Sequence, residues 1–198
     1  MKLELFTREN ISSLVWSQTP DGDYARRYLL PIMMDGAQKY IKNVYNTQFM
    51  LAKVDDVIIP ITTSDFHPDN SYTCSPYSHY VSYGGFEEVK HLNNPPVEAL
   101  IKLIMQPVAW YFRNTDLDKV AYVNNYLLST NLYPSVNSDQ LSALSEALPV
   151  WFPDRVIVFR SVDERKNPHI IEALKKRNYE MVLSRQVWYM DPEKASRT

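Results

Sequence analysis

The chain has 198 residues, of which 45% are hydrophobic and 22% charged, and its net charge is -2 at pH 7. This length and composition suit one soluble globular domain with a sizeable core. The slightly negative charge argues against a nucleic-acid surface, which needs concentrated positive charge, and no apolar run approaches the ~18 residues of a membrane span.

The first residues and the cysteine count bear on the cellular compartment. The opening stretch MKLELFTREN carries early acidic residues and no apolar core, so we expect no signal peptide. Cys74 is the sole cysteine, which excludes a framework of intrachain disulfides and suits a reducing environment. We therefore expect a cytoplasmic protein.

The first half of the chain predicts a helix, a hairpin and a short strand. Residues 21–45 place apolar side chains at helical spacing. Residues 49–63 predict a β-hairpin that turns at Asp55–Asp56. Pro60 favours an edge position for the second strand of this hairpin, because proline lacks an amide donor. Residues 78–83 alternate in polarity as a strand does.

The second half alternates between helices and strands. Residues 87–92 and 96–114 predict helices, and the latter is apolar on several faces, so we expect it to be buried. Two strand–helix units follow, and a long final strand is predicted over residues 179–190. The ranges of these units are 120–123, 137–148, 155–161 and 167–178. This alternation predicts an α/β sheet with right-handed crossovers.

No repeat, low-complexity tract or linker divides the chain, so we expect one domain of the α/β class, with a single mixed sheet flanked by helices. Within it we distinguish an N-terminal helical part (1–48), the mixed sheet with its crossover helices (49–191) and a tail (192–198).

The most informative segment directly follows the strand predicted over residues 120–123. In an open α/β sheet, ligands usually bind at the carboxyl ends of the strands. Here that end carries neutral hydrogen-bonding groups, with Tyr122, Tyr126 and Tyr133 interleaved. The polar residues are Asn124, Asn125, Ser129, Thr130 and Asn131. Such a site suits an amide, hydroxyl or carbonyl group better than acid–base chemistry.

Two arginines share strand faces with apolar residues. Arg160 and Arg185 must find an anion or acceptors there, because burying an unpaired guanidinium is costly. One interpretation is a clamp for a carboxylate or phosphate. The other is pairing with an internal acid such as Asp163 or Glu180, or, for Arg160, a place at the strand end in water.

Gly84–Gly85 is the one glycine pair in a chain of only 4 glycines. A turn between a strand and a helix is the right context for a backbone anion cradle, but Glu87 and Glu88 would repel phosphate there, so a plain turn is favoured. Cys74 and His79 could pair as nucleophile and base, yet nothing evident orients the histidine, and an inert cysteine is favoured.

No metal site is expected, because the histidines lack the spacing of metal ligands. No GxSxG, P-loop or HExxH motif occurs either. His79, together with Tyr80, is instead expected to contact a ligand. The high tyrosine content, 14 of 198 residues, suits a binding surface because the ring is rigid and has a polar tip.

The closing segment NPHIIEALKKRNYEMVLSRQVWYMD (167–191) resembles the last helix and strands of the GNAT acyltransferase superfamily, with Ala173-Leu174 and Asn178-Tyr179 at its "ALxxxGF" positions. SPYSHYVSY, VNNYLLSTNLYP and FPDRVIVFRSV are similar to segments of the FemAB-like branch. The resemblance covers residues 49–191 as an order of elements, and its specific motifs cover about a third of that range.

This resemblance implies a single GNAT-like half that moves an acyl or aminoacyl group from a thioester or ester donor to an amine. An acyl-CoA or other acyl carrier would then be a substrate, with no permanently bound cofactor. The catalytic candidates are Asn124, Asn125, Tyr126, Ser129 and Thr130. The substrate-binding candidates are His79, Tyr80, Asn131, Tyr133, Arg160 and Arg185, and Gly84 and Gly85 are the candidates for cofactor binding.

The chain departs from the family in two ways. The pyrophosphate loop [QR]xxGx[GA] is absent, and YGGFEE is its nearest approximation. A protein with two GNAT-like halves would also be about twice as long, so a second GNAT-like domain or a homodimer is an expected partner. The alternative function is a non-catalytic half that holds an amino-acid or peptide ligand or docks a second domain. An assembly subunit is a third possibility.

Overall fold

The computed structural model describes residues 1–184 and 186–190, and only the backbone of Asp21. One five-stranded sheet runs in the order β1-β2-β3-β4-β5. The strands are β1 (Leu3–Phe6), β2 (Thr47–Val54), β3 (Val57–Ser64), β4 (Val120–Val123) and β5 (Val156–Phe159). The first four pair antiparallel and β4 pairs with β5 in parallel, so the predicted mixed α/β sheet is confirmed.

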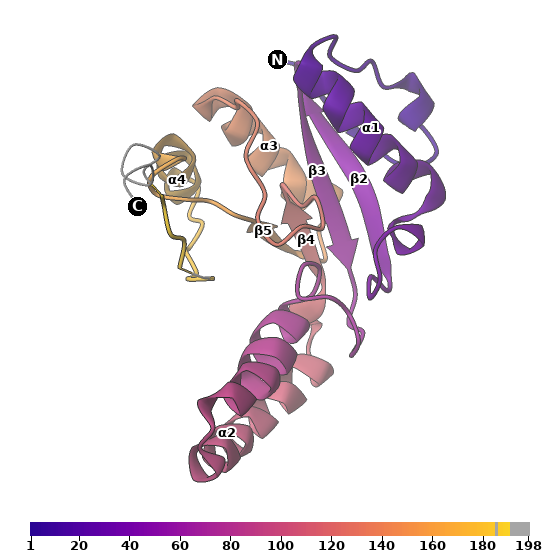
Figure 1. Ribbon diagram of the computed structural model, residues 1–198. Helices are drawn as coiled ribbons and strands as arrows, with labels where there is room; N and C mark the ends of the chain where they lie inside the picture. The colour runs from indigo at the N-terminus through magenta and orange to yellow at the C-terminus, as the bar shows by residue number, and fades with distance from the viewer. Residues whose placement is uncertain (185, 191–198) are drawn as a thin grey trace, which may run out of the picture.

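Helices cover both faces of this sheet (Figure 1). Helix α1 (Pro20–Asp35) packs on one face, where its Leu29 and Ile32 join a core with Leu51 of β2. Helices α3 (Ser138–Trp151) and α4 (Pro168–Lys176) pack on the other face. Short 3₁₀ helices complete the body: η1 (Ile11–Ser13), η2 (Ala37–Lys39) and η5 (Asp116–Asp118).

Local signals explain α3 and the hairpin. The Asn137 side chain accepts from the amide of Gln140, and the Gln140 side chain accepts from the amide of Asn137, so α3 begins with a complete capping box. The β2–β3 turn contains Asp55 at a φ of 51°, a left-handed conformation that Asp tolerates better than most residues.

The sequence predicted that Pro60 lies on an edge strand, and this is wrong. Its strand β3 lies between β2 and β4. The Pro60 carbonyl accepts from the amide of Asn125 at 3.1 Å, so Pro60 faces the side of β4 beyond its last residue, Val123. Proline has no amide hydrogen to donate, and the side of β3 to which it would donate lies beyond the end of β4.

A helical arm, residues 77–114, extends away from the sheet (Figure 1). It consists of the π-helix η3 (Tyr77–Glu87), the 3₁₀ helix η4 (Glu88–Leu92) and α2 (Pro95–Asn114). The strand predicted over residues 78–83 is therefore wrong, and so is the expected burial of the helix over 96–114. Of the α2 residues, only Ala109 is buried.

Two further predictions differ from the structure. Residues 1–48 contain β1 as well as helices, so this part is not purely helical. The final strand predicted over residues 179–190 does not form in the residues described there, and β5 is left at the sheet edge with Val156 47% exposed. A strand needs a partner as well as an apolar pattern. The predicted tail, 192–198, lies outside the described residues.

Within the part of the chain that the structure describes, no helix is both long and apolar enough to cross a membrane. The same residues contain no cluster of His, Cys, Asp and Glu side chains able to hold a metal ion.

Candidate functional site

Strands β4 and β5 run in parallel, so their carboxyl ends meet at one rim of the sheet. Val123 lies opposite Phe159, and the backbone amide of Arg160 donates to the Val123 carbonyl at 3.0 Å. Residues 124–133, which we name the rim loop, leave β4 at this point. The rim of a parallel strand pair is where a ligand site is expected in such sheets.

Asn125 is held by the chain itself. Its Nδ2 donates to Thr62 Oγ1 at 2.6 Å and to the Thr73 carbonyl at 3.0 Å. Its Oδ1 accepts from the Leu127 amide at 3.0 Å and from Arg160 Nη1. The fully buried amide thus uses both its donor and acceptor ends to join β3, the 65–76 connection, the rim loop and the end of β5. Asn125 is a structural residue of the rim.

Asn124 presents the opposite case. Its side chain is 0% exposed, yet neither Oδ1 nor Nδ2 has a hydrogen-bond partner among the described residues. The same holds for Nδ2 of Asn131 and the hydroxyl of Tyr133, while the fifth such atom, Ser78 Oγ, lies on η3. Buried polar atoms without partners are rare and each calls for an explanation. Four of the five therefore gather in the rim loop.

The backbone around the rim is strained. Asn124 has a φ of 60°, Leu127 a φ of 58° and Ser161, just after β5, a φ of 58°. Asparagine tolerates this region, but a leucine there is uncommon. Backbone strain of this kind tends to cluster at functional sites. Two hydrogen bonds hold the loop in place. The backbone amide of Asn131 donates to Ser161 Oγ at 3.2 Å, and Asn131 Oδ1 accepts from the backbone amide of Tyr126 at 3.3 Å.

Arg160 directly follows β5 and bonds to the rim loop. Besides Asn125, its Nη1 donates to the Leu128 carbonyl at 3.4 Å, and its guanidinium lies over the Tyr122 ring at 5.5 Å from the centroid. Arg160 is thus engaged with the amide, carbonyl and ring of its own chain. Arg185, the other predicted clamp, lies outside the described residues.

Burial shifts the pKa values of the tyrosines near the rim. It raises the pKa of Tyr133 and of Tyr122, and the nearby Arg160 charge only partly opposes this rise. Burial also raises the pKa of Tyr126, whose carbonyl accepts from the Tyr28 hydroxyl at 2.8 Å. All three phenols therefore stay protonated at neutral pH, so each can donate a proton but cannot act as a base.

The remaining predicted residues lie at different places. Ser129 and Thr130 are exposed on the rim loop, away from the buried amides. His79 and Tyr80 belong to η3, where their rings stack with centroids 4.6 Å apart. Besides burial, Tyr80 contributes to the raised pKa of Tyr122. However, η3 begins at the amino end of β4, where the Tyr77 amide donates to Asp118, and not at the rim.

The expected turn at Gly84–Gly85 is wrong, because both glycines lie inside η3 and not between a strand and a helix. A Cβ at Gly85 would come within 2.6 Å of the Met105 side chain of α2, and one at Gly84 would lie 3.2 Å from the His79 carbonyl. Gly85 permits close packing of α2 on η3, whereas the near neighbour at Gly84 belongs to η3 itself, so this pair does not form an anion cradle between a strand and a helix. Cys74 is buried, in line with the inert role favoured from the sequence.

Asp118 was missed by the sequence reasoning. It lies just before β4, is 1% exposed, and accepts from Ser75 Oγ at 2.9 Å and from the Tyr77 amide at 2.7 Å. Burial raises the pKa of this carboxyl, and these hydrogen bonds oppose the rise. No local pattern marks it, because its partners lie more than forty residues away. It ties the base of the arm to the sheet.

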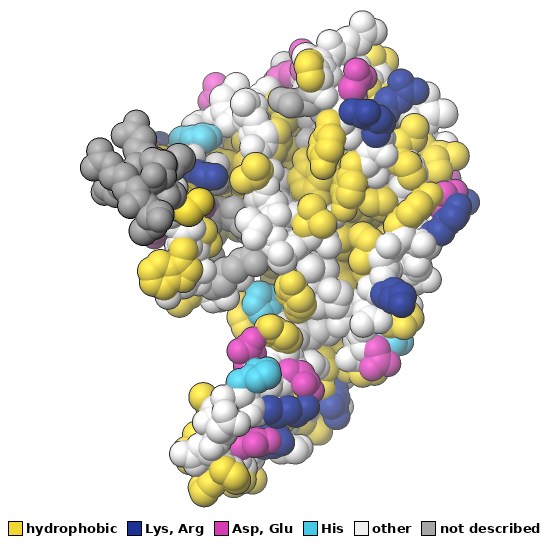
Figure 2. Space-filling model, viewed as in Figure 1, with side chains coloured by type: hydrophobic (Ala, Val, Ile, Leu, Met, Phe, Trp, Pro, Cys, Tyr) yellow, Lys and Arg dark blue, Asp and Glu magenta, His cyan; other side chains and the backbone are white. Residues whose placement is uncertain are grey.

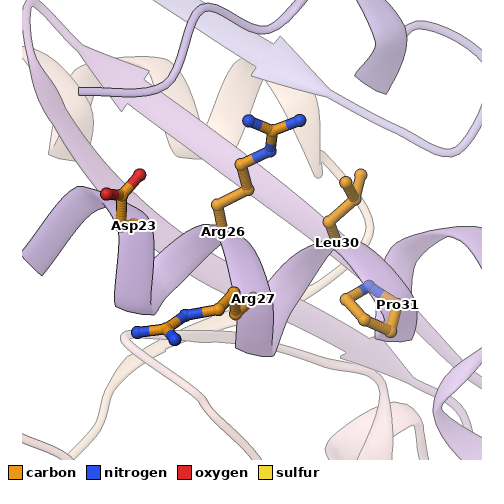
Figure 3. A pocket seen from close by; sticks show the side chains of 5 residues that line it. All are labelled: Asp23, Arg26, Arg27, Leu30 and Pro31. Atoms are coloured by element: carbon orange, nitrogen blue, oxygen red, sulfur yellow. The ribbon is translucent and has the colours of Figure 1, made fainter. Parts of the chain in front are cut away.

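Surface hollows lie elsewhere. An open hollow of about 520 Å³ is lined by α1 residues, including Arg26 and Arg27, which Figure 3 shows pointing to opposite sides of the helix. A second hollow, of about 250 Å³, lies between α3 and α4 and includes Ser142 and Lys176. Neither hollow contains a residue of the rim loop.

No family model matches the chain, and searches among curated proteins and among solved structures found no match.

Proposed function

We propose that the chain is a GNAT-like acyltransferase domain that moves an acyl or aminoacyl group from a thioester or ester donor to an amine. The order of the elements supports this proposal. Three antiparallel strands, β1 to β3, precede a parallel β4–β5 pair joined by α3, which makes the mixed sheet flanked by helices that the resemblance implies. The long closing strand that it also implies over residues 179–190 does not form in the residues described there. Function still has to be argued from the site, since one fold hosts many activities.

The observation that carries the proposal is the set of unmatched buried atoms in the rim loop. Asn124 offers one donor and one acceptor, Asn131 one donor and Tyr133 a hydroxyl. A carbonyl or amide group bound there would satisfy them, and an amide left unmatched inside a protein costs about 1–3 kcal/mol. The rim therefore fits an uncharged acyl group better than a charged ligand.

The chemistry follows from these groups. The amine nitrogen attacks the donor carbonyl carbon, forming the new C–N bond, while the C–S or C–O bond to the carrier breaks. Nδ2 of Asn124 donates to the carbonyl oxygen as negative charge develops on it. The Tyr133 hydroxyl gives its proton to the leaving group and recovers one from the attacking amine.

The donor is not expected to be held through a pyrophosphate at α3. The capping box of Asn137 and Gln140 already occupies amides of the first turn, where an anion would otherwise bind. This favours an acyl group on a carrier or a tRNA, or a CoA thioester held in another way. It also favours the second candidate, a non-catalytic half that binds an amino acid or peptide at the same rim.

Thermal unfolding with a panel of acyl-CoA, free CoA and amino acids tests both candidates. A ligand at 100 times its dissociation constant adds ~2.7 kcal/mol of stability. For a chain of this size that corresponds to a shift of roughly 5–10 °C. A shift with acyl donors and turnover of an amine support the transferase, and a shift with amino acids alone supports the binder.

Asn124→Gly is the informative variant, because glycine keeps the left-handed backbone and removes the amide. Its matched control is Asn178→Gly, which makes the same change at a φ of 61° on an exposed residue after α4. We expect the first variant to abolish the ligand shift and the second to keep it. Equal shifts in both variants, or none in the wild type with any ligand, would overturn the proposal.

Tyr133→Phe separates transfer from binding. The variant should still bind the ligand through Asn124 and Asn131 and transfer the acyl group about 100-fold more slowly, a typical loss for one general acid. An unchanged transfer rate would exclude Tyr133 as the proton donor.

A further inference from the structure

Helix α2 carries a row of apolar side chains that no described residue covers. Each is at least 36% exposed, and Ile104, near the middle of the helix, is 57% exposed. The members are Val97, Leu100, Ile104, Val108 and Tyr111. Their spacing of three, four, four and three residues places them on one side of the helix. We name this row the arm stripe.

The adjacent side of α2 is the one that packs within the chain. Met105 lies against Gly85 of η3, and Ala109 is 4% exposed. The Phe112 ring lies 6.3 Å from the Tyr77 ring. The arm is therefore a helix pair with one side closed and the arm stripe open, and Figure 2 shows hydrophobic side chains at its free end beside charged ones.

Charged side chains of α2 bond to neighbours within the arm. Glu98 pairs with Lys102, and Arg113 donates to the Tyr77 hydroxyl at 2.6 Å. The arm stripe itself contains no Asp, Glu, Lys, Arg or His. An identical arm would thus meet no like-charge repulsion across the stripe, while an acidic or basic partner would find no complement there.

The stripe is also symmetric about its centre. When two such helices cross in antiparallel orientation at Ile104, Val97 of one copy faces Tyr111 of the other, and Leu100 faces Val108. Each small side chain at one end then meets a larger one from the other copy, and Ile104 meets its own counterpart. A two-fold interface requires this kind of self-complementarity.

The available area is of the right order. Leu103 and Trp110, at 69% and 66% exposed, flank the stripe and widen it. Together these side chains expose on the order of several hundred Å² of apolar surface, more than isolated monomers normally leave open. A standard interface buries about 800 Å² per partner, and weaker, reversible interfaces bury less, so the stripe and its flanks suit a reversible dimer.

We propose that two copies of this chain pair through the arm stripe, with α2 antiparallel to its counterpart and the two-fold axis at Ile104. The proposal is independent of the acyltransferase assignment, because it uses no residue of the rim.

Sedimentation velocity of the full chain over a range of concentrations tests the pairing. We expect a reversible dimer for the wild type and a monomer for Ile104→Glu and for Ile104→Lys, since each places like charges face to face at the axis. Mixing the two variants should restore a dimer that contains one copy of each. The control is Val150→Glu, an equally polar change at a residue of α3 that is 78% exposed.

The possible results separate cleanly. A monomeric wild type at all concentrations overturns the proposal, and so does a dimer that survives Ile104→Glu. Failure of the mixed variants to pair, with circular dichroism showing both folded, rejects the antiparallel axis at Ile104. Loss of the dimer in Val150→Glu would place the interface elsewhere.

Discussion

Strand β4 has a buried polar cluster at each end, and the two clusters differ. At the amino end, Asp118 accepts from Ser75 and from the Tyr77 amide, and its carboxylate is matched by the chain. At the carboxyl end, Asn125 is matched in the same way, but the neighbouring Asn124 has no partner for either polar atom. Burial of a polar side chain therefore does not by itself mark a site, whereas burial without hydrogen-bond partners does.

Removing the amino-terminal cluster should have the largest effect on folding. Asp118→Ala leaves the Ser75 hydroxyl and the Tyr77 amide buried without their acceptor. Each loss costs about 1–3 kcal/mol, so we expect a destabilisation of about 3 kcal/mol by urea unfolding. The matched control is Asp116→Ala, an exposed residue of the same turn paired with Lys119, which should change stability by less than ~1 kcal/mol. Equal losses in the two variants would contradict this account.

Asn125→Ala should come second, at about 2 kcal/mol, because Thr62, Thr73 and the Leu127 amide each lose a partner. Asn125→Asp keeps the acceptor for Leu127 and Arg160 but places a buried carboxylate oxygen against the Thr73 carbonyl, so its loss should be at least as large. A stability equal to that of the wild type in both variants would show that the bonds of Asn125 do not hold the rim.

The pH dependence of stability should show a smaller effect at Asp118. Its folded-state pKa is raised, so the native state binds the proton more tightly than the unfolded chain does. Stability contributed by this proton is present below the unfolded pKa and lost as pH rises through the folded pKa. Asp118→Asn removes the titration, so the difference in unfolding free energy between wild type and variant should fall with rising pH in the acid range. A flat or rising difference would mean that the sign of the shift is wrong.

The smallest effect is expected at Asn124. Asn124→Gly removes an amide whose unmatched burial costs about 1–3 kcal/mol and adds the entropic cost of glycine, about 0.5–1 kcal/mol, so its unfolding free energy should fall by no more than about 0.5 kcal/mol. A loss as large as that of Asn125→Ala would show that Asn124 is also matched in solution, and the difference between the two neighbouring residues would disappear.

Local signals in the sequence predicted much of the fold. Helices α3 and α4 follow their caps and apolar stripes, and the hairpin follows its turn. The rim loop was found because a polar run directly follows an apolar strand. These features depend on residues that are close along the chain, so the pattern and the structure agree.

Features that depend on distant residues were not predictable. An Asp at position 118 is buried only because η3 returns to it, and residues 179–190 lack the strand partner that their pattern would require. The apolar composition of α2 suggested burial, but the arm leaves the body of the protein and exposes its stripe. Likewise, the sequence does not distinguish Asn124 from Asn125, because the hydrogen-bond partners of these two amides come together only in the folded chain.

The central claim is that the unmatched, buried side-chain amide of Asn124 hydrogen-bonds an uncharged acyl or amide ligand. Its side-chain NH₂ signal can be identified in the NMR spectrum of ¹⁵N-labelled protein as the one that Asn124→Gly removes. We predict that this signal shifts when an acyl donor or an amino acid binds, while the NH₂ signal of Asn125, held by Thr62 and Thr73, stays in place. An Asn124 signal that does not move with any ligand of the panel would contradict the account.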